Sequence, residues 1–558
     1  MHRRRIHALQ GWPCIVDPQN SGFGSSRRMH KMGPPVSVDR TRAFASSLAF
    51  AFCYFILIPF VNYFRDPKGL RKYPKLTFWS GISDLPFIYE AHKGFRSNAL
   101  LKAHQKSPVI RIGPNALSFS SPKAIKDIYG HNTACTKDIF YQELAGSHYH
   151  LADVIDKSEH ARKRKMLSSA YAIKNLEGWE YKVADMASRL IRAFDARCTA
   201  PLPAGQDPKE EDLTIDYRKW TNLFTVAAIA NIGLSEDLGF LDRGDDLITS
   251  EAADGTLKQV HFRECLHATA WVQSNLVWSY DWYKRFAALS KLVSSTYRKK
   301  WQLNQDWDGI VRNRATTRFK RYQAGEKLDD FFTAILHDKS GTPNNLEWGE
   351  MVAEVSIMMN AGSDTTAIAM NNVMFLLLKH PECLKKLREE LDGVLDEDEE
   401  VAPYDKVKHL PYLRACLDEA LRLLPPTTFG LPRRTPPEGA PVDGDFVPGN
   451  TTVSISSYIA HRNPTIFAEP EQYRPERWLG DAGKELQPYF IAFSAGARGC
   501  IGRNISYLEQ MVVLASVLHR YEFALPHPKW EPTRRENFNL SPGPMPLKIW
   551  RRKNASEA

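Results

Sequence analysis

The sequence lacks the cysteine spacing of a metal-binding or disulfide-rich protein. Its eight cysteines are scattered along 558 residues, and no two of them form a C-x-x-C pair. This spacing indicates neither a zinc site nor a disulfide framework, and it fits a reducing compartment. Internal repeats are absent, and no glycine-rich phosphate loop leads into a helix, so no flavin or nicotinamide site is predicted. Any electrons that the chemistry needs must therefore come from another protein.

Excess charge is also scarce over most of the chain. The net charge is +10, and residues 1–42, with eight Lys or Arg and two Asp, hold +6 of it. The remaining +4 is spread over more than 500 residues, which excludes the charge balance of a nucleic-acid-binding protein. The first 42 residues are basic and rich in Gly, Ser and Pro, a composition typical of disorder. Because Met29 and Met32 directly precede an apolar run, translation starting at either of them is a second interpretation.

That apolar run, residues 43–64, is the one long stretch without a charge. Its 22 residues match the ~20 that a membrane-spanning helix needs. A buried helix of a soluble protein is the alternative. Basic residues follow at once, which predicts a cytosolic body after a single anchor; they are Arg65, Lys68, Arg71, Lys72 and Lys75. We interpret residues 65–89 as a proline-containing hinge and residues 90–558 as the main globular domain.

The most specific pattern in the chain is F-x-x-G-x-R-x-C-x-G, from Phe493 to Gly502. Cys500 precedes an apolar-periodic helix predicted over 507–518, so backbone N–H groups and the positive helix end should lower its pKa and favour the thiolate. Gly496, Gly499 and Gly502 allow a tight turn and close approach to a flat ligand. Arg498 offers a forked cation for a carboxylate, and Phe493 can cover the sulfur. A lone cysteine in a glycine-rich turn is more often simply buried, but the full pattern outweighs that interpretation.

With these residues the chain resembles the cytochrome P-450 superfamily of haem-thiolate monooxygenases, over roughly residues 65–550. The resemblance implies a mainly α fold with a small β-rich lobe. It implies haem b with Cys500 as the iron ligand, and Arg498, Phe493, Gly496 and Gly502 beside the cofactor. Electrons would come from NADPH through a partner NADPH–cytochrome P-450 reductase. A thiolate ligand pushes electron density onto haem iron and favours O–O cleavage.

The longest helical pattern, residues 346–380, contains Ala361-Gly362-Ser363-Asp364-Thr365-Thr366. Small side chains at Ala361 and Gly362 leave room beside the helix for a ligand. A helical threonine can bond to the carbonyl three or four residues back, and Thr365 could instead donate to dioxygen in that gap. Asp364 could relay protons as a general acid. The alternative is a helix weakened by glycine. The stretch resembles the family's oxygen-activating motif, which assigns Thr365 and Asp364 as catalytic.

Other matches are single residues. His160 and Arg164 share a helix face and resemble the family's W-x-x-x-R contact with the haem propionates, with His in place of Trp. Arg433 matches another propionate contact, and the adjacent Arg434 is the alternative for it. Glu419 and Arg422 with Arg477 resemble the E-x-x-R and P-E-R-F elements, which implies a buried structural network. Solvated basic faces and chance i,i+3 pairs are the alternatives. Arg162, Lys163 and Lys165 could also face an acidic reductase.

The predicted function is hydroxylation or another oxidation of an apolar or aromatic small molecule. The residues within and around the motifs resemble those of fungal benzoate-4-monooxygenase-like members of the family, many of which modify secondary metabolites. The resemblance places the protein in the endoplasmic reticulum membrane, single-pass, with a cytosolic catalytic domain and no nucleic-acid partner. Two alternatives remain: a reductase-independent isomerase or dehydratase, against which the intact Asp364-Thr365 pair argues, and a non-catalytic haem-binding protein.

Overall fold

The computed structural model describes residue 49 and residues 53–552, so the predicted leader 1–42 and most of 43–52 lie outside the described residues. The chain divides into two compact units, Met1–Ile58 and Pro59–Ala558. In the first unit, Cys53–Leu57 forms a π-helical turn (η1). Among the residues that the structure describes, no helix is long and apolar enough to cross a bilayer.

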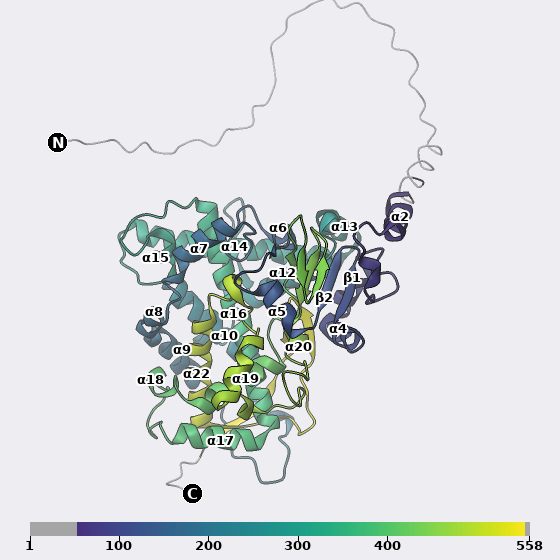
Figure 1. Cartoon of the computed structure of the whole chain (residues 1–558). Coiled ribbons are helices and arrows are strands. Elements are labelled where there is room, and N and C mark those ends of the chain that lie inside the picture. The colour runs from purple at the N-terminus through teal and green to yellow at the C-terminus, as the bar shows by residue number, and fades with distance from the viewer. Residues whose placement is uncertain (1–48, 50–52, 553–558) are drawn as a thin grey trace, which may run out of the picture. The chain divides into compact units, whose positions relative to one another are not determined.

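The second unit is mainly helical (Figure 1). Its helices, the first of which begins one residue before the unit does, are α2 (Ile58–Arg65), α3 (Leu85–Lys93), α4 (Arg96–His104), α5 (Pro122–Tyr129), α6 (Phe140–Leu144), α7 (Lys157–Ser168), α8 (Ile173–Gly178), α9 (Glu180–Asp195), α10 (Tyr217–Leu234), α11 (Phe240–Arg243), α12 (Phe262–Leu276), α13 (Tyr283–Val293), α14 (Ser295–Gln323), α15 (Phe331–Leu336), α16 (Trp348–Lys379), α17 (Pro381–Asp392), α18 (Tyr404–Val407), α19 (Pro411–Leu423), α20 (Ser457–Ala460), α21 (Gly480–Leu486) and α22 (Arg503–Arg520). Short 3-10 turns include η4 (Tyr280–Trp282), η5 (Pro475–Trp478) and η7 (Gly496–Arg498).

The strands form one five-stranded sheet and several smaller ones. The larger sheet has the order β1-β2-β10-β7-β3, with β10 parallel to β2 and its other pairs antiparallel. The strands are β1 (Val109–Gly113), β2 (Ala116–Phe119), β3 (Thr136–Lys137), β4 (Ile215–Asp216), β5 (Leu247–Glu251), β6 (Leu257–His261), β7 (Arg433–Arg434), β8 (Ala440–Val442), β9 (Asp445–Val447), β10 (Thr452–Ile455), β11 (Tyr521–Ala524), β12 (Arg534–Asn537), β13 (Asn539–Pro542) and β14 (Pro546–Arg551). The predicted mainly α fold with a small β-rich lobe is confirmed.

Helix α16 (Trp348–Lys379) runs through the core of the unit and matches the helix predicted over residues 346–380. A capping box between Glu347 and Glu350 starts it, and Pro381, which cannot continue the hydrogen-bond ladder, follows its C-cap. It packs against α10, α19 and α22 around one large apolar core (Figure 1). The helix after Cys500, predicted over 507–518, is α22 and begins earlier. These two helices bring the two main sequence motifs into one core.

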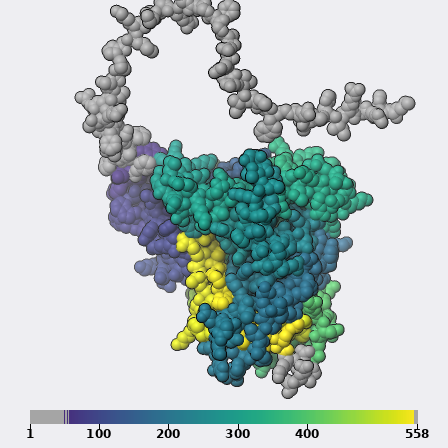
Figure 2. All heavy atoms as spheres, turned by 180° about the vertical axis from the view of Figure 1, so that it is seen from behind, coloured from purple at the N-terminus to yellow at the C-terminus, as the bar shows by residue number. Residues whose placement is uncertain are grey.

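Strands β5 and β6 form a hairpin, in which residues 247–251 alternate between more exposed and more buried positions. The hinge predicted over 65–89 packs on the body: Leu70 is buried, and Arg111 N–H donates to Pro74 O at 2.7 Å. Seen from behind (Figure 2), C-terminal residues, in yellow, lie at the surface beside the N-terminal part of this unit, in purple and blue. A buried ion pair joins α4 to β12, with Arg96 Nε 3.0 Å from Glu536 Oε1.

Candidate active site

Cys500 and Thr365 line the same cavity, which measures ≈ 480 Å³. The loop before α22 and the middle of α16 form part of its wall. Helix α12, the turn between β12 and β13, and the segment before β7 contribute further wall residues. The sequence motifs that lie 135 residues apart, from 365 to 500, therefore meet in one space.

The loop that presents Cys500 is fixed by its own backbone. Cys500 N–H donates to Phe493 O at 2.9 Å, and Gly499 N–H donates to Gly496 O at 3.0 Å across η7. Gly496 has φ = 64°, and a Cβ there would lie 2.2 Å from Tyr129 O. Only glycine fits such a position. The motif glycine therefore docks the loop onto α5 and leaves the sulfur facing the cavity.

The electrostatics of Cys500 differ from the prediction. The side chain is exposed to the cavity rather than to bulk water, and burial raises the pKa of the thiol. The N–H groups of Gly502 and Arg503 and the charges of Arg164 and Arg503 oppose this rise without reversing it. The predicted lowering by the helix end is therefore wrong for the protein alone. A metal ion bound at a thiol deprotonates it outright, so a soft, cationic ligand such as haem iron suits this sulfur.

Four basic side chains surround His160 at one end of the cavity: Lys137, Arg164, Arg433 and Arg498. Burial and the neighbouring arginines hold the pKa of Lys137 well below its usual range in the protein alone, so an anion beside it would favour its charged form. Arg164 Nη1 donates to Gly499 O at 2.7 Å, and Arg498 donates to Val154 O and Ile155 O at 2.8 and 2.9 Å. Among the described residues, no carboxylate lies within ion-pair distance of any of the four. Burial and these charges lower the pKa of His160 to about 3, so its ring is neutral.

Such a cluster requires a negative partner, because unpaired buried charge is costly. Two carboxylates of one planar ligand, as in haem, match four cations beside a cavity that also exposes a thiol. The structure thus brings together the predicted His160, Arg164, Arg433 and Arg498. Sequence reasoning missed Lys137, which pairs in register with Arg433 across β3 and β7 and donates to Ala152 O. It missed Tyr141 as well, whose hydroxyl accepts from Arg433 Nη1 at 3.2 Å.

On α16, Thr365 Oγ1 donates to Ala361 O at 2.8 Å, as expected for a helical threonine. Gly362 has a packing role that the sequence did not reveal, since a Cβ there would lie 2.7 Å from Ile229 of α10. Asp364 has three partners outside its helix: Arg218, His267 and Asn539. None of these three was predicted, and no pattern in the sequence marks them.

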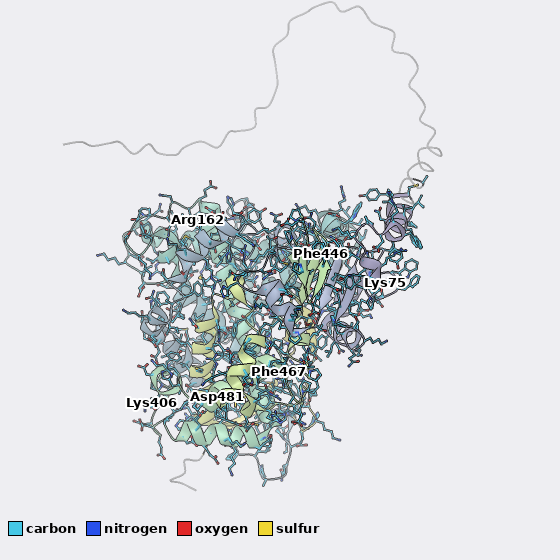
Figure 3. The ribbon with its side chains drawn as sticks, viewed as in Figure 1. Lys75, Arg162, Lys406, Phe446, Phe467 and Asp481 are labelled. Atoms are coloured by element: carbon cyan, nitrogen blue, oxygen red, sulfur yellow. The ribbon has the colours of Figure 1, made fainter. Side chains whose placement is uncertain are left out.

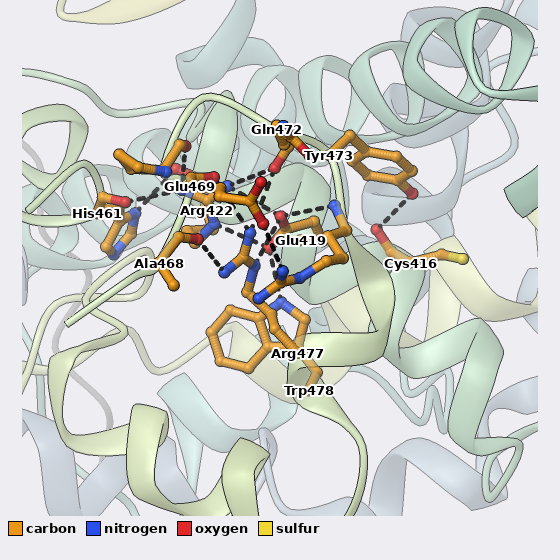
Figure 4. Close-up of polar contacts among 12 residues, drawn as sticks. Cys416, Glu419, Arg422, His461, Ala468, Glu469, Gln472, Tyr473, Arg477 and Trp478 are labelled. Carbon is orange, nitrogen blue, oxygen red and sulfur yellow. Dashed lines mark hydrogen bonds and ion pairs between the residues drawn. The ribbon is translucent and has the colours of Figure 1, made fainter. Parts of the chain in front are cut away.

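The predicted network of Glu419, Arg422 and Arg477 lies together in the core (Figure 4). Arg422 Nε and Arg477 Nε approach Glu419 at 2.8 and 3.0 Å. Trp478, which stands where the family has Phe, donates its Nε1–H to Glu419 Oε2 at 2.9 Å. His461 links the network to the Cys500 loop: its carbonyl accepts from Arg422, and its Nε2 accepts from Ile491 N–H at 2.9 Å.

Of the three basic residues considered for a reductase, Lys163 is excluded. Its ammonium is buried and lies 3.1 Å from Glu354 and 3.0 Å from Glu350. It neutralises Glu354, a buried acid on α16, and is therefore not available to a partner protein. Arg162 lies at the surface and pairs with Glu159 at 2.7 Å (Figure 3).

Glu509 on α22, another residue that sequence reasoning missed, is a buried acid in the cavity wall, and burial raises its pKa well above the usual range.

Comparison with known proteins agrees with this site. The family model described as Cytochrome P450 matches residues 88–549. The chain belongs to the cytochrome P450 family. A cytochrome P450 monooxygenase, atr2, of Stereocaulon alpinum is 30% identical over 86% of this chain and 89% of its own length. The benzoate 4-monooxygenase bphA of Aspergillus niger is 28% identical over 84% and 90%, and an averantin hydroxylase of Dothistroma septosporum is 27% identical over 83% and 82%.

The P450 assignment makes the chain an oxidoreductase, a haem-thiolate monooxygenase. Haem is the family's cofactor, a redox partner supplies its electrons, and a small molecule is its substrate. The isomerase, dehydratase and non-catalytic alternatives are not favoured.

Proposed function

We propose that this P450 oxidises an apolar or aromatic small molecule in fungal secondary metabolism, using haem b and electrons from NADPH delivered by a membrane-bound P-450 reductase. The observation that supports the proposal is the shared cavity, in which the Cys500 sulfur, Thr365 and four unpaired cations meet. Two relatives are named as hydroxylases of averantin, in Dothistroma septosporum, and of tryprostatin B, in Aspergillus fumigatus.

In the proposed mechanism, haem would supply oxygen activation at its iron when bound. Cys500 Sγ would ligate the iron, and Arg164, Arg433 and Arg498, joined by Lys137, would hold the carboxylates. His160, being neutral, adds no further charge. Phe493 stands in the wall beside the sulfur and limits water there. Thr365 takes part in proton delivery, with its hydroxyl free to exchange its bond to Ala361 O for one to a cavity oxygen, and the neighbouring Asp364 belongs to the same path as a fixed negative charge.

For the substrate we propose a neutral aromatic or polycyclic compound over a small aromatic acid. Apolar side chains are prominent in the cavity wall, including Leu266, Ile357, Phe429 and Phe538. Arg218, which lies outside the wall, is already neutralised by Asp364 at 2.6 Å. With the arginines of the wall assigned to the haem carboxylates, an incoming carboxylate would find no free guanidinium, whereas a ring can stack on Phe429 or Phe538.

We also propose a single-pass anchor in the endoplasmic reticulum membrane, with residues 43–64 as the span. The uncharged run and the basic residues after it support this location. Exposed aromatic side chains stand at the end of the run and after it, among them Phe64, Phe78 and Trp79. Such side chains favour the membrane–water interface.

Two experiments test the proposal. Cys500→Ala should abolish the thiolate-type absorption of the reduced, carbon monoxide-bound protein, and retention of that band would refute the ligand assignment. Deleting the gene in its source organism and profiling metabolites should reveal an accumulating precursor. Adding that precursor to the protein with a reductase should then consume NADPH and O2; haem without such consumption would favour a non-catalytic protein.

A further inference from the structure

Asp364 collects donors from three other elements. Its Oδ1 accepts from Arg218 Nη2 of α10 at 2.6 Å and lies 3.2 Å from His267 Nε2 of α12, and its Oδ2 accepts from Asn539 Nδ2 of β13 at 3.1 Å. The Asp364 and Arg218 side chains are both 7% exposed, so they form a buried ion pair. Arg218 is not part of the cavity wall, whereas Asp364, His267 and Asn539 are.

This arrangement does not suit Asp364 as a proton store. Burial alone would raise its pKa, but the Arg218 guanidinium, His267 and Asn539 together hold the pKa of this carboxyl well below its usual range. A general acid works best when its pKa lies near the working pH. The carboxylate is therefore a permanent anion beside the cavity, and the proton must reside on another group.

His267, unlike Asp364, is a side chain that can exchange a proton with the cavity. Its side chain is 42% exposed and lines the same cavity as Thr365. Imidazole is the side chain whose ordinary pKa lies closest to neutrality. A carboxylate bonded to one ring nitrogen fixes the tautomer and orients the ring. Here Asp364 keeps the proton on Nε2, which leaves Nδ1 as the nitrogen that can gain and lose a proton.

We propose that His267, positioned by Asp364, holds the exchangeable proton for the oxygen pocket beside Thr365. This inference rests on the proposed monooxygenase function and names the residue that serves it. In the step, the Nδ1–H proton of the imidazolium passes to a cavity water. The neutral ring keeps its Nε2–H bond to Asp364 and regains a proton from solvent, with no change in electrons.

Other charged groups on the elements packed against α12 are held by other partners. Lys299 of α14 pairs with Glu264 at 3.8 Å, Lys258 of β6 with Asp306 at 2.6 Å, Lys284 of α13 with Glu143 at 3.6 Å, Lys93 of α3 with Glu90 at 2.7 Å, and Arg535 of β12 donates to His92 O at 3.0 Å. Within the described residues, Asp364 is thus the charged group in contact with His267, and Arg218 is the next charge behind it.

The test compares His267→Gln with a matched control. Glutamine keeps an N–H donor for Asp364 but cannot titrate. His380→Gln removes another half-exposed histidine that contacts a carboxylate, Glu382, at 3.3 Å. Product formed and peroxide released per NADPH are measured from pH 5.5 to 8.5 with a reductase. Wild type and the control should lose coupling as the pH rises through one titration, whereas His267→Gln should show no such step and leak several-fold more peroxide. A wild-type pH profile in His267→Gln would overturn the proposal.

A second measurement needs no turnover. Carbon-13- and nitrogen-15-labelled histidine in the full-length protein gives ring resonances, and the one missing from His267→Gln identifies His267. We expect an Nε2-protonated neutral tautomer and a titration midpoint equal to that of the coupling step. A ring that does not titrate between pH 5 and 9, or that carries its neutral-state proton on Nδ1, would overturn the proposal. If no substrate is ever oxidised, the proposed function fails while this measurement still decides the role of His267 as a proton carrier.

Discussion

Two clusters of buried and half-buried basic side chains in this P450 differ in how their charges are balanced. In the network of Glu419, Arg422 and Arg477, each guanidinium meets a carboxylate, and the Glu419 and Arg422 side chains are fully buried. Around His160, Arg433 and its three cationic neighbours have no acid partner among the described residues. Since breaking a buried pair is costly and isolated buried charge is costly too, the first cluster is complete within the fold, and the second is completed by a ligand.

The largest loss of unfolding free energy should come from removing one charged partner from the network of Glu419, Arg422 and Arg477. Arg422→Ala leaves Glu419 short of a partner and removes donors to His461 O and Pro470 O. Loss of one member of a buried pair costs about 3–5 kcal/mol. Urea unfolding of the purified protein measures this loss, and haem content should fall with it.

Arg474→Ala is the control, because Arg474 pairs with Glu469 at the surface, where both side chains are largely exposed. Exposed pairs contribute at most about 1 kcal/mol. If Arg422→Ala were no more destabilising than Arg474→Ala, the network would not hold the core together.

Removing a single hydrogen bond to Glu419 should cause a smaller loss of stability and tests whether the charge of Glu419 matters. Trp478→Phe keeps an aromatic ring but removes the Nε1–H bond to Glu419. Bonds to a charged group contribute about 1.5–3 kcal/mol. Trp301→Phe, which removes a bond from Nε1 to the neutral hydroxyl of Ser290, should cost only about 0.5–1.5 kcal/mol. Equal losses of unfolding free energy in the two variants would mean that the Glu419 charge adds nothing.

The sequence predicted the complete cluster better than the incomplete one. Glu419 and Arg422 are three residues apart on α19, so their contact is local. The long α16 was predictable to within two residues at its start, because its apolar periodicity is sustained and Pro381 ends it. Cys500 and Thr365 were predictable from motifs, each of which is short and continuous.

What could not be predicted depends on contacts between distant segments. Lys137 reaches the cavity through the register of β3 against β7, and a two-residue strand has no recognisable pattern. Arg218 and His267 meet Asp364 from 146 and 97 residues away. The pKa of Cys500 was mispredicted for a related reason: the helix end was visible in the sequence, but the burial that outweighs it was not.

The incomplete cluster should also respond to pH. Burial and the neighbouring cations lower the pKa of His160 to about 3 from the 6.5 of an exposed histidine. Between these values the unfolded state binds the extra proton, so the free energy of unfolding should fall as the pH drops from 6.5 towards 3. His160→Asn should flatten part of this slope in unfolding curves measured at pH 4, 5, 6 and 7. An unchanged slope would mean that His160 is protonated in the folded protein.

The smallest effect on the protein alone should come from removing a basic side chain that has no acid partner. Lys137 and Lys163 are both buried lysines, 8% and 1% exposed, but of the two only Lys163 has carboxylate partners among the described residues. Lys163→Met leaves Glu354 without its charge partner and should cost about 3–5 kcal/mol. Lys137→Met removes repulsion from Arg433 and Arg498 along with one bond to Ala152 O, so the haem-free protein should change by about 1 kcal/mol or less.

The order of the two lysine variants should reverse when haem is bound. Lys137→Met should then release haem several-fold faster to an acceptor protein, because one of four charges facing the carboxylates is gone. Lys163→Met should release it no faster than its lower stability requires, which unfolding curves of the loaded protein measure independently. Lys137→Met could instead destabilise the haem-free protein as strongly as Lys163→Met. The protein alone would then already stabilise Lys137, and the distinction between charges paired within the fold and charges paired by a ligand would be wrong at this site.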